Sequence, residues 1–175
     1  EIGKYAIMGE DDYDNQNWNN IITNSGFKDL NNTYELIYKE GYEPILLAGL
    51  SSNLSDTKNA KDKIKLINDY IDSLKESEEI NIPHYKILLM HEPDYITDIT
   101  YQNYDLILAG HSHNGQVRLP FIGALLKPEK AQEYYDEYYK LDNTDFYISS
   151  GMGTTRLDFR LFNRPAINFY RLVNK

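Results

Sequence analysis

The stretch from Asp105 to Gln116 reads DLILAGHSHNGQ and joins an apolar run directly to two histidines. Such a run is typical of a buried strand, so the sequence predicts a strand that delivers His111 and His113 to a tight turn at Gly110. Alternate residues of a strand face the same side, so the two imidazoles can converge on one site. Imidazole is the commonest neutral nitrogen ligand of transition metals. The first hypothesis is therefore a metal site.

Two other apolar runs also end in side chains that bind metals. Residues 86–90 lead into His91, and residues 4–8 lead into Gly9-Glu10-Asp11-Asp12. Each cluster alone has an ordinary alternative: a capped histidine, a solvated acidic turn, or a polar turn that closes a strand. In open α/β sheets, ligands collect beyond the carboxyl ends of the strands. Three such clusters at one sheet edge therefore favour the metal site over three separate coincidences.

The composition limits the class of protein. A chain of 175 residues is long enough for one domain with a hydrophobic core and short for two. The formal net charge of -9 argues against a nucleic-acid-binding protein, which needs a basic surface. The chain has no cysteine, which excludes disulfides and thiolate metal sites within it. No stretch approaches the roughly 18–20 apolar residues that span a bilayer.

The periodicity of apolar residues predicts alternating strands and helices. Helices are predicted at 16–25 and 58–75, with a short one within 93–100. Strands are predicted at 4–8, 27–30, 34–38, 44–50, 85–90, 104–109, 146–149 and 166–172. No repeat or linker divides the chain, so residues 1–175 are predicted to form a single α/β unit.

Three blocks of the chain, Tyr5–Tyr13, Met90–Pro93 and Gly110–Gln116, each lie at the end of an apolar run. In this order they resemble the strand-GNHD, single-histidine and GHxH blocks of the calcineurin-like metallophosphoesterase family. Further segments resemble connecting segments of its membrane-associated bacterial branch: 45–50, 147–154 and 160–165. The resemblance covers nearly the whole chain, and the ordered set is more specific than GHxH alone.

The resemblance implies a fold and a metal centre. The fold would be the C-terminal part of a four-layer αββα sandwich. The centre would hold two divalent ions (manganese, iron or zinc) that together promote phosphoester hydrolysis. By position, His91 and His111 would ligate one metal and His113 the other. Glu10 would replace the asparagine ligand of the GNHD block.

The chain departs from the family pattern at two places. Asp11 stands where the family has a histidine that assists the leaving group, and Asp12 matches the aspartate that orients this histidine. An aspartic acid acts as an acid near neutral pH only if its pKa is raised, and nearby cations lower it. The family's Asp-x-His and Gly-Asp-x-x-Asp blocks are absent from residues 1–175. We therefore expect a C-terminal portion of the protein that lacks half of the metal ligands and is inactive alone. Such a fragment can be free of metal.

Two main functions are open at this point. The first is a phosphoesterase, in the full-length parent, that hydrolyses phosphomonoester, phosphodiester or pyrophosphate bonds. The alternative is a noncatalytic binding or interaction module whose site has decayed at Asp11. A third option is a mononuclear metal-binding fold unrelated to phosphoesterases.

The resemblance also bears on partners and location. It implies a phosphorylated small-molecule or lipid-linked substrate, whereas the expectation of no nucleic acid comes from the acidic charge of the chain. It places a membrane anchor upstream of Glu1, and without such an anchor we expect a cytoplasmic protein. A chain that forms one half of a sandwich exposes apolar surface, so we also expect self-association.

Overall fold

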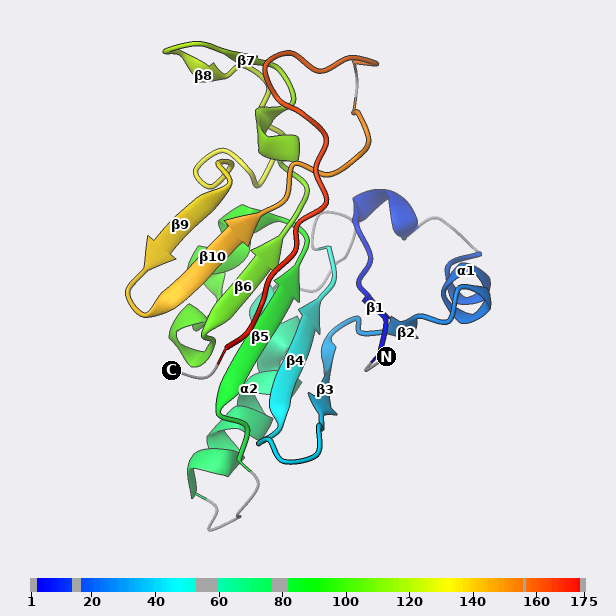
Figure 1. Ribbon diagram of the computed structural model, residues 1–175, viewed down its shortest axis with the longest axis vertical. Coiled ribbons are helices and arrows are strands. Elements are labelled where there is room, and N and C mark those ends of the chain that lie inside the picture. Colours follow the sequence, from blue (N-terminus) through cyan, green and yellow to red (C-terminus); the bar gives the residue numbers. More distant parts are fainter. Residues whose placement is uncertain (1–2, 14–16, 53–59, 77–81, 156, 174–175) are drawn as a thin grey trace.

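The sheet at the centre of the molecule has six strands (Figure 1). The computed structural model describes residues 3–13, 17–52, 60–76, 82–155 and 157–173. In spatial order the strands are β3 (Thr33–Ile37), β4 (Ile45–Leu50), β5 (Tyr85–Met90), β6 (Leu106–Ala109), β10 (Thr144–Ile148) and β9 (Tyr138–Leu141). The four central strands, β4, β5, β6 and β10, run parallel, and β3 and β9 pair antiparallel at the two edges.

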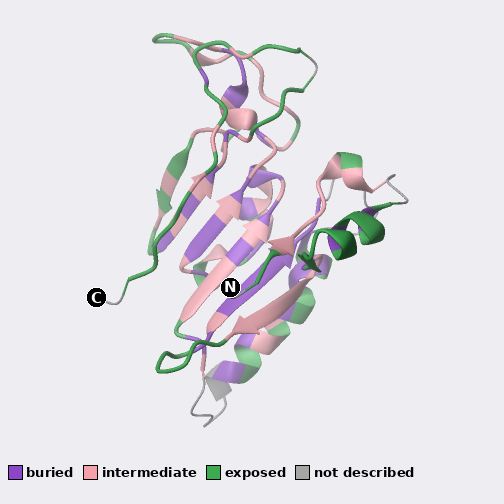
Figure 2. Cartoon of the chain, turned by 45° about the vertical axis from the view of Figure 1, so that its right-hand side comes forward, coloured by how far each residue is buried: buried purple, intermediate pink, exposed green. Residues whose placement is uncertain are grey.

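Helix α2 (Ala60–Glu76) covers one face of this sheet. Its apolar residues recur every three or four positions and lie inward, where Ile64, Ile67 and Ile71 are almost completely buried. The strand residues that face the helix alternate along each strand and belong to the same buried core: Leu46, Ala48, Leu88, Ile107 and Phe146. Figure 2 shows this interface as the main buried region. Burial of each large side chain stabilises the fold by about 1.5–3 kcal/mol, so this interface holds the sheet together.

The C-terminal tail lies along the opposite face of the sheet as an extended segment (Figure 1). The Tyr170 ring packs on the Tyr147 ring of β10, with centroids 5.0 Å apart. The Ser149 hydroxyl donates to the Asn168 side-chain oxygen at 3.0 Å. The tail is thus attached through side chains and one backbone hydrogen bond of 3.0 Å, from the Ala166 N–H to the Gly151 carbonyl, and not through a ladder of such bonds. The strand predicted at 166–172 is therefore wrong, although the segment is apolar and extended.

A small parallel sheet lies beside β3 and β4. It pairs β1 (Tyr5–Ala6) with β2 (Lys28–Asp29), which follows helix α1 (Trp18–Asn24). It approaches the large sheet at Gly49, where an added Cβ would lie 2.3 Å from the Leu30 carbonyl oxygen. The segments 27–30 and 34–38, predicted as neighbouring strands, therefore belong to two different sheets.

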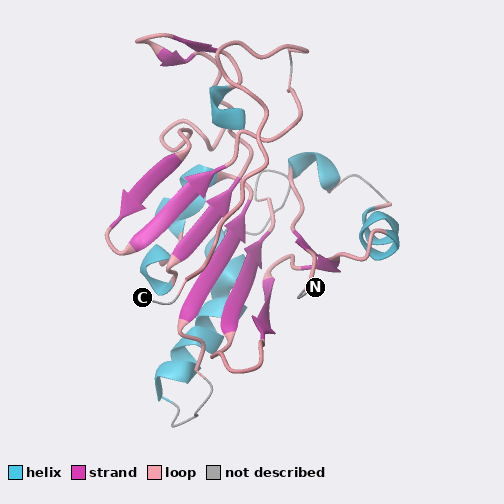
Figure 3. Cartoon of the chain, viewed as in Figure 1, coloured by secondary structure: helices cyan, strands magenta, loops and turns pink. Residues whose placement is uncertain are grey.

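The remaining elements are short. A hairpin joins β7 (Arg118–Leu119) to β8 (Gly123–Ala124). Four 3-10 helices complete the described part: η1 (Glu10–Asp12), η2 (Pro93–Asp98), η3 (Tyr101–Asn103) and η4 (His113–Gly115). Figure 3 shows that mostly loops lie beyond the carboxyl ends of the parallel strands.

These elements confirm the α/β class predicted from the sequence. Helix α2 and the central strands begin and end within two residues of their predicted limits. Residue 16 and residues 58–59, which the sequence assigns to the two longer helices, lie outside the described residues. The sequence did not predict β7, β8 or β9 as strands. Within the described ranges, no helix is long and apolar enough to cross a bilayer.

A buried polar network connects α2 to the carboxyl end of β4. The Lys63 side chain, only 4% exposed, donates to the Ser52 carbonyl and, at 3.1 Å, to the Tyr13 hydroxyl. Tyr13 and Ser51 share a hydrogen bond of 2.8 Å between their hydroxyls. The Ser52 hydroxyl donates to the carboxylate of Glu92, which is 1% exposed. Because buried polar groups are costly when unpaired, this network fixes the segment after η1 against the sheet.

The network predicts a strong effect of Lys63→Met on stability. Methionine fills much of the same volume but removes the cation from a network that includes the buried Glu92 carboxylate. We expect the free energy of unfolding, measured by urea denaturation, to fall by roughly 3 kcal/mol.

Lys65→Met is the matched control on the same helix. Lys65 is exposed and pairs with Asp69 at 2.5 Å, so its loss should change the free energy of unfolding by less than about 0.5 kcal/mol. Equal effects of the two substitutions would show that the Lys63 network does not stabilise the fold.

Candidate metal centre

The candidate site lies at the sheet edge where the parallel strands end. His91 follows β5 directly, and His111 lies two residues beyond β6. The register pairs Met90 with Ala109, so the two histidines leave neighbouring strands at a similar height. Glu10 arrives from outside the large sheet, as the first residue of η1. The site thus joins three segments that are far apart in the sequence.

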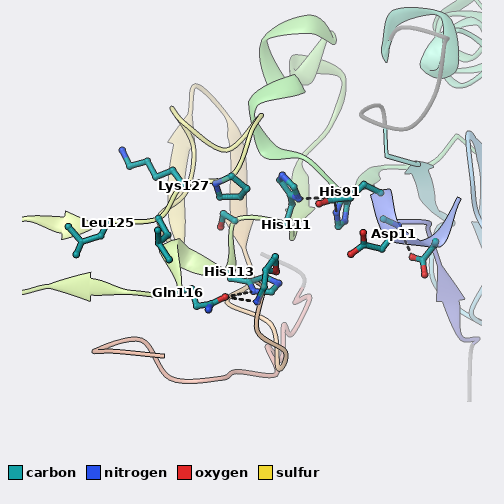
Figure 4. Close-up of a pocket in the computed structure, with 14 residues that line it drawn as sticks. Asp11, His91, His111, His113, Gln116, Leu125 and Lys127 are labelled. Carbon is teal, nitrogen blue, oxygen red and sulfur yellow. Dashed lines mark hydrogen bonds and ion pairs between the residues drawn. The ribbon is translucent and has the colours of Figure 1, made fainter. Parts of the chain in front are cut away.

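The Glu10 carboxylate lies between the two imidazoles. Its Oε2 is 2.6 Å from His91 Nε2 and 2.9 Å from His111 Nδ1. Figure 4 shows the His91 and His111 rings side by side, and their centroids are 4.9 Å apart. One ligand atom from each of the three residues lies within 4.8 Å of the others. Two imidazole nitrogens and a carboxylate oxygen are a donor set that fits a divalent transition metal.

Electrostatics favour a charged pair between Glu10 and His111. Burial opposes ionisation of Glu10, but hydrogen bonds and charge attraction from His111 and His91 outweigh it and hold the pKa of Glu10 well below 4.5. Burial also opposes protonation of His111, but the hydrogen bonds to Glu10 and to the Glu129 carbonyl raise its pKa above 6.5. His111 Nε2 lies 2.7 Å from that carbonyl oxygen, so Nδ1 is the nitrogen directed at the candidate metal position.

The turn after β6 differs from the sequence prediction. His111 and His113 have φ values of 60° and 47°, whereas Gly110 is not among the residues with positive φ. The histidines themselves therefore make the turn, in the left-handed region that histidine tolerates better than most residues. Because β6 ends at Ala109, the alternation of a strand no longer applies at positions 111 and 113. The prediction that both imidazoles lie on one strand face is therefore wrong, because neither histidine belongs to the strand.

His113 lines the same pocket as the three-residue group but is not a member of it. Its Nδ1 lies 3.4 Å from the Gln116 side-chain oxygen (Figure 4), and Asn163 donates to its backbone carbonyl. Burial lowers the pKa of His113 below 6.5. A neutral imidazole is the form that binds metals. Its assignment to a second ion stays a prediction.

The acidic residues after Glu10 have separate positions. Asp12 Oδ2 accepts a hydrogen bond of 2.9 Å from the Gly9 backbone N–H, and so caps the turn that presents Glu10. Asp11 is exposed and lines the pocket. Gly9 packs on His91, because an added Cβ would lie 2.8 Å from the imidazole Cε1. The catalytic roles of Asp11 and Asp12 stay predictions.

The three candidate ligands line a cavity of about 400 Å³. Its other wall contains residues to which sequence reasoning assigned no role: Gln116, Leu125, Leu126, Lys127, Pro128 and Thr155. Gln116 organises this wall, since its amide donates to the Leu157 and Phe159 carbonyls and accepts from the Thr155 backbone N–H. Gln116 is visible in the sequence as the last residue of the GHxH block. Residues 125–128 carry no such signal, because only the fold brings them to the site.

Fold and site together define an α/β protein with a candidate metal centre at the carboxyl edge of its sheet. No protein-family model matches the chain, and no solved structure matches it. Named relatives do match, and they assign the family.

The chain is 31% identical to the uncharacterized metallophosphoesterase YkuE of Bacillus subtilis (strain 168), over 98% of the chain and 56% of the relative. It is 27% identical to the uncharacterized metallophosphoesterase YkoQ of the same organism, over 97% of the chain and 60% of the relative. The phosphodiesterase YaeI of Escherichia coli (strain K12) is 30% identical over 55% of the chain and 35% of the relative. The chain belongs to the calcineurin-like metallophosphoesterase family. It spans little more than half the length of YkuE and YkoQ.

The electrostatics of the centre predict a pH-dependent metal affinity. Metal ligands bind in their deprotonated forms, and the proton that Glu10 holds on His111 must leave when a metal enters. We expect the affinity for Mn²⁺, measured by titration calorimetry, to rise by up to about tenfold per pH unit through pH 6.5 and then to level off above the raised pKa of His111.

Two substitutions test the cause of this dependence. Glu10→Gln removes the charge that raises the pKa of His111, so the variant should bind Mn²⁺ more weakly but with a smaller change between pH 6.5 and 8. Glu43→Gln changes the same charge at an exposed pair with His84 and should behave like the unchanged protein. An affinity that does not vary between pH 6 and 8 would contradict the role of His111 as a ligand.

Proposed function

We propose that the chain is the C-terminal portion of a longer, metal-dependent phosphoesterase and supplies half of its metal centre. The observation that carries this proposal is the convergence of Glu10, His91 and His111 at one pocket. Membership in the metallophosphoesterase family supports it. The remaining ligands, in Asp-x-His and Gly-Asp-x-x-Asp blocks, would come from sequence before Glu1.

The residues of this chain have distinct tasks in the proposed reaction. Glu10, His91 and His111 hold a cation, and His113 is proposed for a second ion. Divalent ions, when bound, supply Lewis acidity and an activated water for attack on phosphorus. The chain carries a net charge of -9, so a phosphorylated substrate is attracted only where bound cations reverse the local field. Metal binding is therefore required for substrate binding as well as for chemistry.

Asp11 limits the range of leaving groups. A carboxylate is an acceptor near neutral pH and cannot donate a proton to a departing alkoxide. The proposed substrates are therefore phosphodiesters or pyrophosphates whose leaving groups are stable anions, in a small molecule or a lipid-linked one. A phosphomonoester with an alkyl leaving group would react slowly.

The test uses the full-length protein with Mn²⁺ and bis(p-nitrophenyl) phosphate. We expect turnover, and we expect His91→Ala to reduce kcat/KM by at least about 100-fold because it removes a metal ligand. His84→Ala is the matched control, since His84 lies on the surface and pairs with Glu43 at 2.9 Å. A protein that binds metal but shows no turnover on this or a pyrophosphate substrate would instead be a noncatalytic module.

A second substitution tests the role of position 11. Asp11→His introduces the imidazole that the family pattern has there. We expect it to raise kcat for an alkyl phosphodiester by about tenfold or more, because that leaving group needs a proton. The p-nitrophenyl substrate should change little, since nitrophenolate leaves without one. Asp11→Asn removes the charge without adding an acid and should not reproduce the gain; an equal gain would assign the effect to charge alone.

A further inference from the structure

The orientation of the His111 ring depends on a loop outside the sheet. His111 Nδ1 lies 2.9 Å from the Glu10 carboxylate, and the opposite ring nitrogen, Nε2, lies 2.7 Å from the Glu129 carbonyl oxygen. A carbonyl oxygen only accepts hydrogen bonds, so Nε2 carries a hydrogen and donates it. The loop between β8 and β9, which contains Glu129, therefore decides which nitrogen of His111 is left for a metal.

Burial alone does not hold this loop in place around Glu129. Glu129 is exposed, and within residues 127–133 only Ala131 is buried. Lys130, the next residue, has a φ of 62°, in the left-handed region that residues other than glycine rarely adopt. The φ of Lys130 orients the peptide group that carries the Glu129 carbonyl. Such a conformation persists only where contacts from elsewhere in the structure hold it.

Asp94, in the 3-10 helix η2, supplies these contacts. Its carboxylate accepts hydrogen bonds from three consecutive backbone N–H groups, at positions 132–134, with distances of 2.7, 3.2 and 2.9 Å. Its own backbone N–H donates to the Lys130 carbonyl at 2.9 Å. A single residue thus fixes the backbone that directly follows Glu129.

The backbone before Glu129 is connected to the same residue through Gln132. The Gln132 side chain donates to the Lys127 and Pro128 carbonyls at 2.7 and 2.8 Å. Both of these residues line the cavity that contains the candidate ligands. Because the Gln132 backbone N–H is itself bonded to Asp94, one carboxylate stabilises the loop on both sides of Glu129 and also part of the pocket wall.

We propose that Asp94 is a positioning residue of the metal centre. It acts through the Glu129 carbonyl, which keeps a hydrogen on His111 Nε2 and leaves Nδ1 for the ion. Asp94 lies three residues after His91, so the segment that supplies one candidate ligand also orients another. The proposal rests on the proposed function in one respect, that His111 binds a metal, and it does not depend on turnover.

Asp94→Ala in the full-length protein tests the proposal. We expect its affinity for Zn²⁺, measured by titration calorimetry, to fall by at least about tenfold, because the group that orients a metal ligand is no longer held in place. Asp98→Ala is the matched control, since it removes the same charge from η2. No hydrogen bond joins Asp98 to residues 127–134, all of which are described, so the control should keep its affinity within about twofold.

Asp94→Asn is the milder variant, for use if the alanine variant does not fold. The N–H groups of Gln132 and Tyr134 are bonded to different oxygens of Asp94. An amide offers only one acceptor oxygen, so one of these N–H groups loses its partner. We expect a loss of Zn²⁺ affinity smaller than that of the alanine variant, and no loss at all would contradict the proposal.

NMR of the imidazole groups distinguishes positioning from a general loss of stability. In the Zn²⁺ form, the Nε2–H proton of His111, assigned with His111→Gln, should be shifted downfield by its bond to the Glu129 carbonyl and protected from exchange with water. Asp94→Ala should lose both the shift and the protection, and Asp98→Ala should keep both.

The outcomes separate this proposal from the proposed function. An Asp94→Ala variant that keeps the Nε2–H signal and the affinity would overturn the positioning role, whatever its stability. Equal losses in Asp98→Ala would also overturn it, since the effect would then come from charge alone. A protein that binds Zn²⁺ and shows the signal but does not hydrolyse bis(p-nitrophenyl) phosphate would support the positioning role and contradict the proposed function. A protein that binds no Zn²⁺ would contradict both.

Discussion

The parallel pairing of β4, β5, β6 and β10 is the constraint on which the candidate site depends. Parallel strands end at the same edge of a sheet, so strand pairing alone brings the residues that follow them close together. The register Met90–Ala109 sets the relative height of the two histidine segments. A slip by one residue would turn the buried face of a strand outward. The α2 interface opposes such a slip, and core and site are therefore linked through register.

A second set of interactions fixes the one ligand that does not follow a strand of the large sheet. Glu10 belongs to η1, whose position depends on the Asp12 cap and on the contact between Gly9 and His91. The Tyr13 hydroxyl, three residues further on, joins the buried network around Lys63. The acidic turn is thus attached on both sides. This attachment explains how a carboxylate is held between two imidazoles even though its segment follows β1 of the separate small sheet.

The sequence was sufficient for those parts of the fold that local pattern determines. Three features could be predicted: the period of α2, the apolar runs of the central strands, and the ligand residues at the ends of these runs. Each of them is a pattern within one continuous segment of the sequence. The prediction of a strand at 166–172 was wrong because an apolar sequence favours an extended chain but does not provide a neighbouring strand with which to pair. The prediction of a common strand face for His111 and His113 was wrong because both histidines take left-handed conformations. The wall at 125–128 had no sequence signal, since it is part of the loop between β8 and β9, which only the tertiary fold brings to the pocket.

The connection between β6 and β10 has a consequence for how this protein can diversify. Residues 110–143 contain two histidines, the hairpin and part of the pocket wall, while both ends of the connection are held by one parallel pair, β6 with β10. The entropy of closing such a loop grows only slowly with its length, by about 0.6 kcal/mol for each doubling. Insertions and deletions in the hairpin, residues 118–124, therefore cost little stability, and the large sheet does not need to change. The hairpin next to the outer wall of the pocket is an exchangeable part, through which substrate range can change while the core and the ligands after β5 and β6 stay as they are.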